Sequence, residues 1–123
     1  MKELVIQVGW GGLGDNLLYT PVPRVAKETY NYDKVFISSK MTYRWNGIKE
    51  FIWDKNPYVD GTSDKGYPLP TFSSFAPDKN ILDEVVTFCG LPDDGIRFRD
   101  PEIYYEPKVI NDLKNSVIID PNY

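Results

Sequence analysis

A glycine-rich turn directly after a short apolar run constrains the fold of this chain more than any other feature. The run is Leu4–Val8 (LVIQV), and the turn Gly9–Asp15 (GWGGLGD) leads into a stretch that is compatible with a helix. A buried parallel strand that empties into a glycine turn and a helix is the usual start of an α/β sheet, with a ligand site at the carboxyl end of the strand. We therefore expect an α/β fold in which Leu4–Val8 is a central, buried strand.

The next segments continue an order of strand, helix and strand. Asp15 is expected to be the N-cap of a helix that meets Pro21 and Pro23. Because proline interrupts a helix, this one either kinks there or starts again with Thr20 as cap and Pro21 as first residue. Lys34–Ser38 is predicted as the second strand, which makes a βαβ unit with a parallel sheet.

The middle of the chain is less regular. The interval 45–53 fits a short helix or an irregular segment, and 56–61 looks like a turn before a short third strand. The stretch 61–79 is rich in Pro, Ser, Gly and Asp and is predicted to be a long loop, which in compact domains is usually a binding element or disordered.

The last third contains one clear helix. Asn80 is predicted to cap an amphipathic helix that Gly90 and Pro92 end, with Cys89 on its apolar face. One or two helical turns are expected within 108–115, and Val117–Ile119 is predicted as a final apolar strand.

Composition excludes several classes of function. The chain has 123 residues, a formal net charge of −4, no histidine and one cysteine. No block of basic residues is present, which disfavours nucleic-acid binding. Without histidine, the chain cannot form a Ser-His-Asp catalytic triad or the usual zinc sites. Acid–base catalysis would therefore have to use Asp, Glu, Lys or Tyr. No disulfide within the chain, signal peptide or membrane span is expected, and we predict a cytoplasmic protein.

The glycine turn fits two hypotheses about its ligand. Gly9, Gly11 and Gly14 have the G-x-G-x-x-G spacing of dinucleotide sites, but Asp15 would repel a pyrophosphate there, and the second strand ends in Ser38-Ser39 rather than in an acidic residue. A dinucleotide-binding oxidoreductase is thus the weaker hypothesis. Asp15 is either a helix cap or a carboxylate at the rim of a cleft, oriented to accept a proton from a substrate hydroxyl.

The residues after the turn carry a family resemblance. The segment Gly12–Pro21 (GLGDNLLYTP), with Arg24 and Val25, resembles the N-terminal signature of glycosyltransferase family nine, the ADP-heptose:lipopolysaccharide heptosyltransferases and their relatives. Three later segments look similar: NPYVD at 56–60, FCGL at 88–91 and VIIDP at 117–121. Some fucosyltransferases carry Gly-Gly-Leu-Gly-Asn-Gln instead, so the motif leaves the transferred sugar open.

The resemblance implies a GT-B architecture, with two Rossmann-like domains of parallel sheet and flanking helices and an active site between them. Residues 1–115 would be the Rossmann-like, acceptor-binding domain, and 116–123 the start of a missing donor-binding domain or the last strand of this one. The family's proposed general base maps onto Asp15, and Trp10, Gly12, Gly14 and Asn16 are expected to contact the acceptor. The implied reaction is an inverting, metal-independent transfer from a nucleotide sugar, which is a co-substrate and not a cofactor.

The expected partners follow from the same resemblance. They are a glycan or glycolipid acceptor of the cell envelope, and a nucleotide sugar held by the missing domain; without that domain the chain is expected to be inactive. Such a protein could also associate peripherally with a membrane, or form homo-oligomers through exposed surfaces. The alternative hypothesis is a stand-alone, non-catalytic α/β binding module. We expect Arg44, Arg97 and Arg99 to be solvated, and Trp10 either to stack on a sugar or to cover the end of the sheet.

Overall fold

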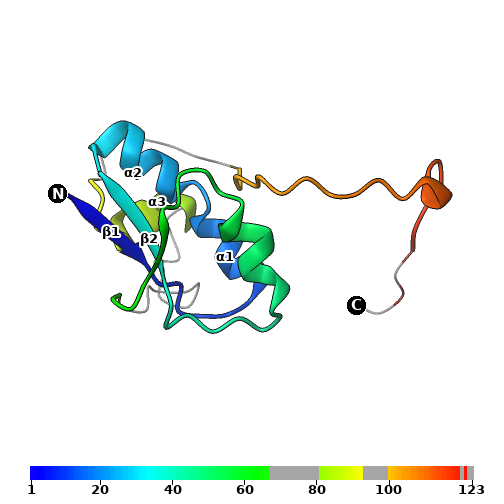
Figure 1. Ribbon diagram of the computed structural model, residues 1–123, viewed down its shortest axis with the longest axis horizontal. Coiled ribbons are helices and arrows are strands. Elements are labelled where there is room, and N and C mark those ends of the chain that lie inside the picture. The colour runs from blue at the N-terminus through cyan, green and yellow to red at the C-terminus, as the bar shows by residue number, and fades with distance from the viewer. Residues whose placement is uncertain (67–80, 93–99, 120, 122–123) are drawn as a thin grey trace.

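A small parallel sheet forms the centre of the protein. The computed structural model describes residues 1–66, 81–92, 100–119 and 121. Its strands are β1 (Glu3–Ile6), β2 (Lys34–Ser38) and β3 (Gly61–Ser63), in the order β1-β2-β3 and parallel at both pairings (Figure 1). This confirms the predicted α/β fold with a parallel sheet and a short third strand. Within the described residues, however, β2 is central and β1 is an edge strand, because β3 joins beyond β2; the prediction of a central first strand is wrong there.

Two separate helices connect β1 to β2. They are α1 (Leu13–Tyr19) and α2 (Val22–Tyr30), so the segment is interrupted at Pro21 and does not continue as one kinked helix. Pro23 is tolerated in the first turn of α2, where its missing N–H has no intrahelical partner.

Both predicted caps are wrong. Gly12 is the N-cap of α1 and makes no side-chain cap bond, while Asp15 is the third residue of the helix. Pro21, not Thr20, precedes α2. The hydroxyl of Thr20 instead donates to the carbonyl of Leu17 at 2.8 Å, within the turn that ends α1.

Three further helical elements follow. The ambiguous interval 45–53 contains most of a π-helix, η1 (Lys49–Asp54). The predicted amphipathic helix is present as α3 (Ile81–Phe88), and Gly90 ends it with a φ of +76°, which favours glycine. The expected turns within 108–115 reduce to one 3₁₀ turn, η3 (Asn111–Leu113). The predicted cap Asn80 and most of the long loop lie outside the described residues.

The core lies between the sheet and the helices. Its members come from β1, β2, α1, α2, η1 and α3, and each fully buried Val, Ile or Leu side chain contributes about 1.5–3 kcal/mol. Burial raises the pKa of the Cys89 thiol to about 12, so the side chain stays protonated and packs as a small apolar group, as predicted.

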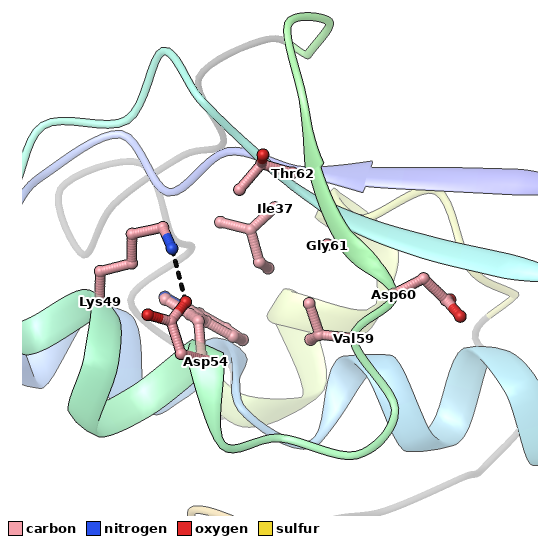
Figure 2. A pocket seen from close by; sticks show the side chains of 8 residues that line it. Ile37, Lys49, Asp54, Val59, Asp60, Gly61 and Thr62 are labelled. Atoms are coloured by element: carbon pink, nitrogen blue, oxygen red, sulfur yellow. Dashed lines mark hydrogen bonds and ion pairs between the residues drawn. The ribbon is translucent and has the colours of Figure 1, made fainter.

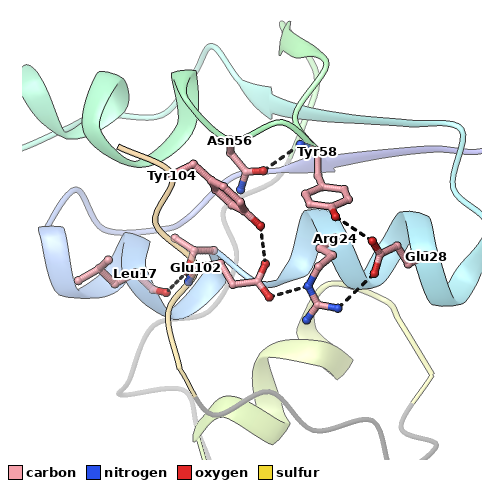
Figure 3. Close-up of polar contacts among 8 residues, drawn as sticks. Leu17, Arg24, Glu28, Asn56, Tyr58, Glu102 and Tyr104 are labelled. Atoms are coloured by element: carbon pink, nitrogen blue, oxygen red, sulfur yellow. Dashed lines mark hydrogen bonds and ion pairs between the residues drawn. The ribbon is translucent and has the colours of Figure 1, made fainter. Parts of the chain in front are cut away.

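The C-terminal segment first follows the body and then extends away from it (Figure 1). Arg24 Nε donates to a carboxylate oxygen of Glu102 at 2.6 Å (Figure 3). The Glu102 amide donates to the Thr20 hydroxyl at 2.8 Å. Beyond this anchor, Val117–Ile119 is exposed and forms no strand, so the predicted final strand is wrong; no described strand lies beside it to supply backbone partners.

Asp60, directly before β3, bonds this part of the chain to β2 and α2. Its carboxylate accepts the Val35 amide at 2.8 Å and pairs with Lys27 at 2.7 Å, and its own amide donates to the Val35 carbonyl at 2.8 Å. Partial burial acts to raise the pKa of Asp60, but the hydrogen bonds from Lys27 and Val35 and the charges of Lys27 and Lys34 outweigh it, so that the pKa lies below 3.8.

Asp60 should therefore make folding sensitive to acid. Because its pKa is lower in the folded protein, its stabilisation is present above the unfolded pKa and is lost as pH falls through the folded pKa. Urea unfolding between about pH 5 and about pH 2 should lose part of its pH dependence in Asp60→Asn. Asp64→Asn removes an exposed charge directly after β3 and serves as control. Equal pH curves for wild type and Asp60→Asn would contradict the assignment.

Candidate functional site

The glycine turn packs closely against the loop that follows β2. The Arg44 amide donates to the Gly11 carbonyl at 2.9 Å. A Cβ atom on Gly11 would lie 2.5 Å from the Thr42 carbonyl oxygen and 2.9 Å from the Arg44 nitrogen. Both neighbours are backbone atoms, so only glycine permits this approach. The two loops therefore form one unit at the carboxyl end of the sheet.

Asn16 supports the turn from the interior. Its side chain is fully buried; Nδ2 donates to the Gly12 carbonyl at 2.8 Å, and Oδ1 accepts the indole N–H of Trp53 at 2.9 Å. Both ends of the amide are thus engaged within the protein. The structure places Asn16 beneath the site, where it positions the turn, and not at its surface.

Asp15 lies above the turn at the start of α1. A Cβ on Gly12 would lie 2.7 Å from Asp15 Oδ2 and 4.0 Å from Arg44 Nη1. The absence of a side chain at Gly12 thus leaves room for the carboxylate to fold back over the turn, with the guanidinium beside it. A carboxylate in the first helical turn is also stabilised by the helix dipole, by about 0.3–1 kcal/mol at exposed positions.

The rim around Asp15 contains exposed aromatic and small residues. Trp10 is 53% exposed, and a Cβ on Gly14 would meet nothing within 4 Å, so this side of the turn is open. The structure therefore brings Gly12, Asp15 and Arg44 together, with Gly14 next to Asp15 in α1 and the exposed Trp10 two residues before Gly12 in the same turn. The prediction that Arg44 is solvated is confirmed, since the residue is exposed, although its guanidinium also lies near the glycine turn. Topology indicates this proximity, since loops that follow neighbouring parallel strands meet at one edge of the sheet.

Tyr19 lies one helical turn after Asp15, beneath the surface. Burial, with smaller contributions from Cys89 and Asp15, raises the pKa of its phenol. The phenol therefore stays neutral at physiological pH.

A second polar group lies near the carboxyl ends of the strands. Gln7 is 8% exposed, and its side-chain oxygen is buried without a hydrogen-bond partner in the part of the chain that is described. Gly66, at a φ of +122°, comes so close that its Cβ would lie 3.2 Å from that oxygen. Gly66 also lines a cleft of about 500 Å³ with Lys40, Asp64 and Lys65.

A different hollow, of about 380 Å³, lies between η1 and β3 (Figure 2). Lys49 and Asp54 at its edge are paired with each other, and Asp60 points away from them toward its own partners, Lys27 and Lys34. Because its charged groups are already paired within the protein, this hollow has fewer groups available to bind or react with a ligand than the rim at Asp15.

The described residues carry neither a metal-binding cluster nor a membrane-spanning helix. They contain no group of three or more His, Cys, Asp and Glu side chains arranged to hold a metal ion. Within the same ranges, none of the helices has the length and apolar character that crossing a bilayer requires.

Comparisons of the chain with protein-family models, with curated proteins and with solved structures find no match. The function is therefore inferred from the geometry of the rim and from the sequence motif that forms it.

Proposed function

We propose that this chain is the acceptor-side domain of an inverting glycosyltransferase that uses a nucleotide-sugar donor and acts on an envelope or surface glycan. In this proposal the fold is Rossmann-like and corresponds to the N-terminal half of a GT-B architecture. Asp15 is the general base that takes the proton from the attacking sugar hydroxyl, and the donor is held by a second domain.

The position of Asp15 carries the proposal. A general base must reach the proton that it removes, within about 2.6–3.2 Å of the hydroxyl oxygen. The Asp15 carboxylate is half-buried and held over Gly12 at the start of α1, where the carboxyl end of β1 opens to solvent. Asn16 and Trp53 fix the turn from below, so the carboxylate is supported by the core and not by a loop alone.

Arg44 adds a positive charge beside the base. Its guanidinium flanks the same glycine as the carboxylate. A cation there can meet an anionic group of the acceptor. Trp10 offers an exposed ring at the same rim, of the kind that stacks on the apolar face of a sugar.

The same geometry argues against the dinucleotide hypothesis. A dinucleotide places its pyrophosphate on the amides of the turn and helix start. Asp15 Oδ2 lies 2.7 Å from the position of a Gly12 Cβ, so a negative charge occupies that space. A diphosphate would have to displace a carboxylate held close to its site, which favours a neutral sugar hydroxyl as the ligand.

Titration of the ¹⁵N-labelled chain tests the proposal. Oligosaccharides released from bacterial lipopolysaccharide should shift the amide signals of 9–16 and 42–44, which form one unit through the Gly11–Arg44 hydrogen bond. NAD⁺ should leave the same signals in place. Shifts with NAD⁺ and none with any oligosaccharide would contradict the proposal and support the oxidoreductase hypothesis.

A further inference from the structure

A second cleft, separate from the rim at Asp15, is built from aromatic side chains. It has a volume of about 410 Å³ and is lined by Trp45, Gly47, Glu50, Phe51 and Tyr105. Its size falls within the range of about 300–1,000 Å³ that is usual for small-molecule sites. None of these residues belongs to the glycine turn.

Trp45 is held against the backbone although it is 62% exposed. A Cβ on Gly47 would lie 2.4 Å from Trp45 Cζ2, with two further indole atoms closer than 3 Å. The six-membered part of the indole therefore rests directly on Gly47, in a position that any side chain there would prevent. The exposed indole that lines the cleft is accessible to a ligand.

Two further aromatic side chains of the cleft pack against each other. The rings of Phe51 and Tyr105 pack with their centroids 5.0 Å apart and their planes tilted by 53°. Tyr105 belongs to the C-terminal segment, which the Arg24–Glu102 ion pair holds on the body (Figure 3). The hydrogen bond from the Glu102 amide to the Thr20 hydroxyl adds a second link to the body. The Phe51–Tyr105 side of the cleft is thus in place before a ligand binds.

The cleft continues into a polar groove. Glu50 and Tyr105 also line a neighbouring hollow of about 440 Å³, together with Lys55, Glu106 and Lys108. One end of the combined groove is therefore aromatic, and the other carries ammonium and carboxylate groups that can pair with hydroxyls.

We propose that this groove binds a short oligosaccharide, with one pyranose ring at Trp45 and Glu50 and the next sugars toward Lys55. A pyranose has an apolar face of C–H groups for an aromatic ring and hydroxyls at its edge for a carboxylate, which is the combination that the groove presents. The inference goes beyond the function proposed above, because none of the groove's residues takes part in the chemistry at Asp15.

Titration with maltotriose, cellotriose and mannotriose tests this inference, with the indole N–H signals of the labelled chain as reporters. At least one trisaccharide should shift the Trp45 signal and leave that of Trp53, which is bonded to Asn16 inside the core. Trp45→Ala and Gly47→Ala should each weaken that binding by about tenfold. Glu50→Gln should also weaken it, whereas the control Glu3→Gln on β1 should not. Trp45→Ala and Glu50→Gln alter exposed side chains and keep the test valid if Gly47→Ala does not fold.

The outcomes separate this inference from the proposed function. Shifts at Trp45 without shifts in 9–16 support the groove alone, and shifts in 9–16 without Trp45 overturn the groove alone. Binding of tetramethylammonium at Trp45 with no binding of any trisaccharide would show a cation site and overturn the inference. Saccharide binding that is equal in wild type and Trp45→Ala would also overturn it.

Discussion

Asp15→Asn is expected to lower sugar transfer by the full protein at least about 100-fold, because removal of a general base usually costs between 10² and 10⁴ in rate. The amide has the shape of the carboxylate and fits the space over Gly12, but it cannot accept the proton of the attacking hydroxyl. The loss should appear in turnover at saturating acceptor. The measurement is the rate of nucleotide release from a nucleotide sugar in the presence of the acceptor glycan.

The fold of Asp15→Asn should stay close to that of the wild type. Asp15 is not the helix cap, so the variant loses only the dipole interaction of about 0.3–1 kcal/mol. Asp112→Asn in the exposed η3 turn is a matched control, since it removes one carboxylate far along the chain from the glycine turn. Wild-type turnover in Asp15→Asn would refute its role as base.

Gly11→Ala is expected to lower the free energy of unfolding by about 1–3 kcal/mol, the usual cost of forcing extra atoms into a packed region. The new methyl group would lie 2.5 Å from the Thr42 carbonyl oxygen, and neither loop can yield without stretching the Arg44–Gly11 hydrogen bond. Urea unfolding followed by circular dichroism gives the difference directly.

Gly14→Ala is the matched control for Gly11→Ala and should have the opposite sign. Gly14 lies within α1, and its added Cβ would meet nothing within 4 Å. Replacing a helical glycine by alanine should stabilise the protein by about 0.5–1 kcal/mol. If both variants were equally stable, the close packing of the turn against 42–44 would be wrong.

The local pattern was sufficient to predict the elements that buried, periodic side chains define. β2 and α3 were predicted because their apolar residues and stop signals agree, as Gly90 after α3 illustrates. The caps were predicted incorrectly for a local reason. Asp15 is a good N-cap residue, but Gly12 has extended backbone and lets the helix begin three residues earlier.

The predicted topology brings the loops after β1 and β2 to one edge of the sheet, but individual contacts between them could not be predicted from the sequence. Nothing local indicates that Arg44 lies beside Asp15, because the contact depends on how closely Gly11 meets the loop after β2. The buried pair of Asn16 and Trp53 is similar: an asparagine next to a catalytic candidate suggests a ligand contact, whereas its partner is an indole 37 positions away in the chain. The order of the strands, with β1 at the edge of the described sheet, depends equally on tertiary contacts.

A crystal structure of the protein with an acceptor oligosaccharide tests the central claim most directly. The account predicts a sugar hydroxyl oxygen about 2.6–3.2 Å from a carboxylate oxygen of Asp15, with the sugar ring beside Trp10 and Arg44. An oligosaccharide ordered elsewhere on the surface, with the Asp15 carboxylate in contact with solvent alone, would contradict it.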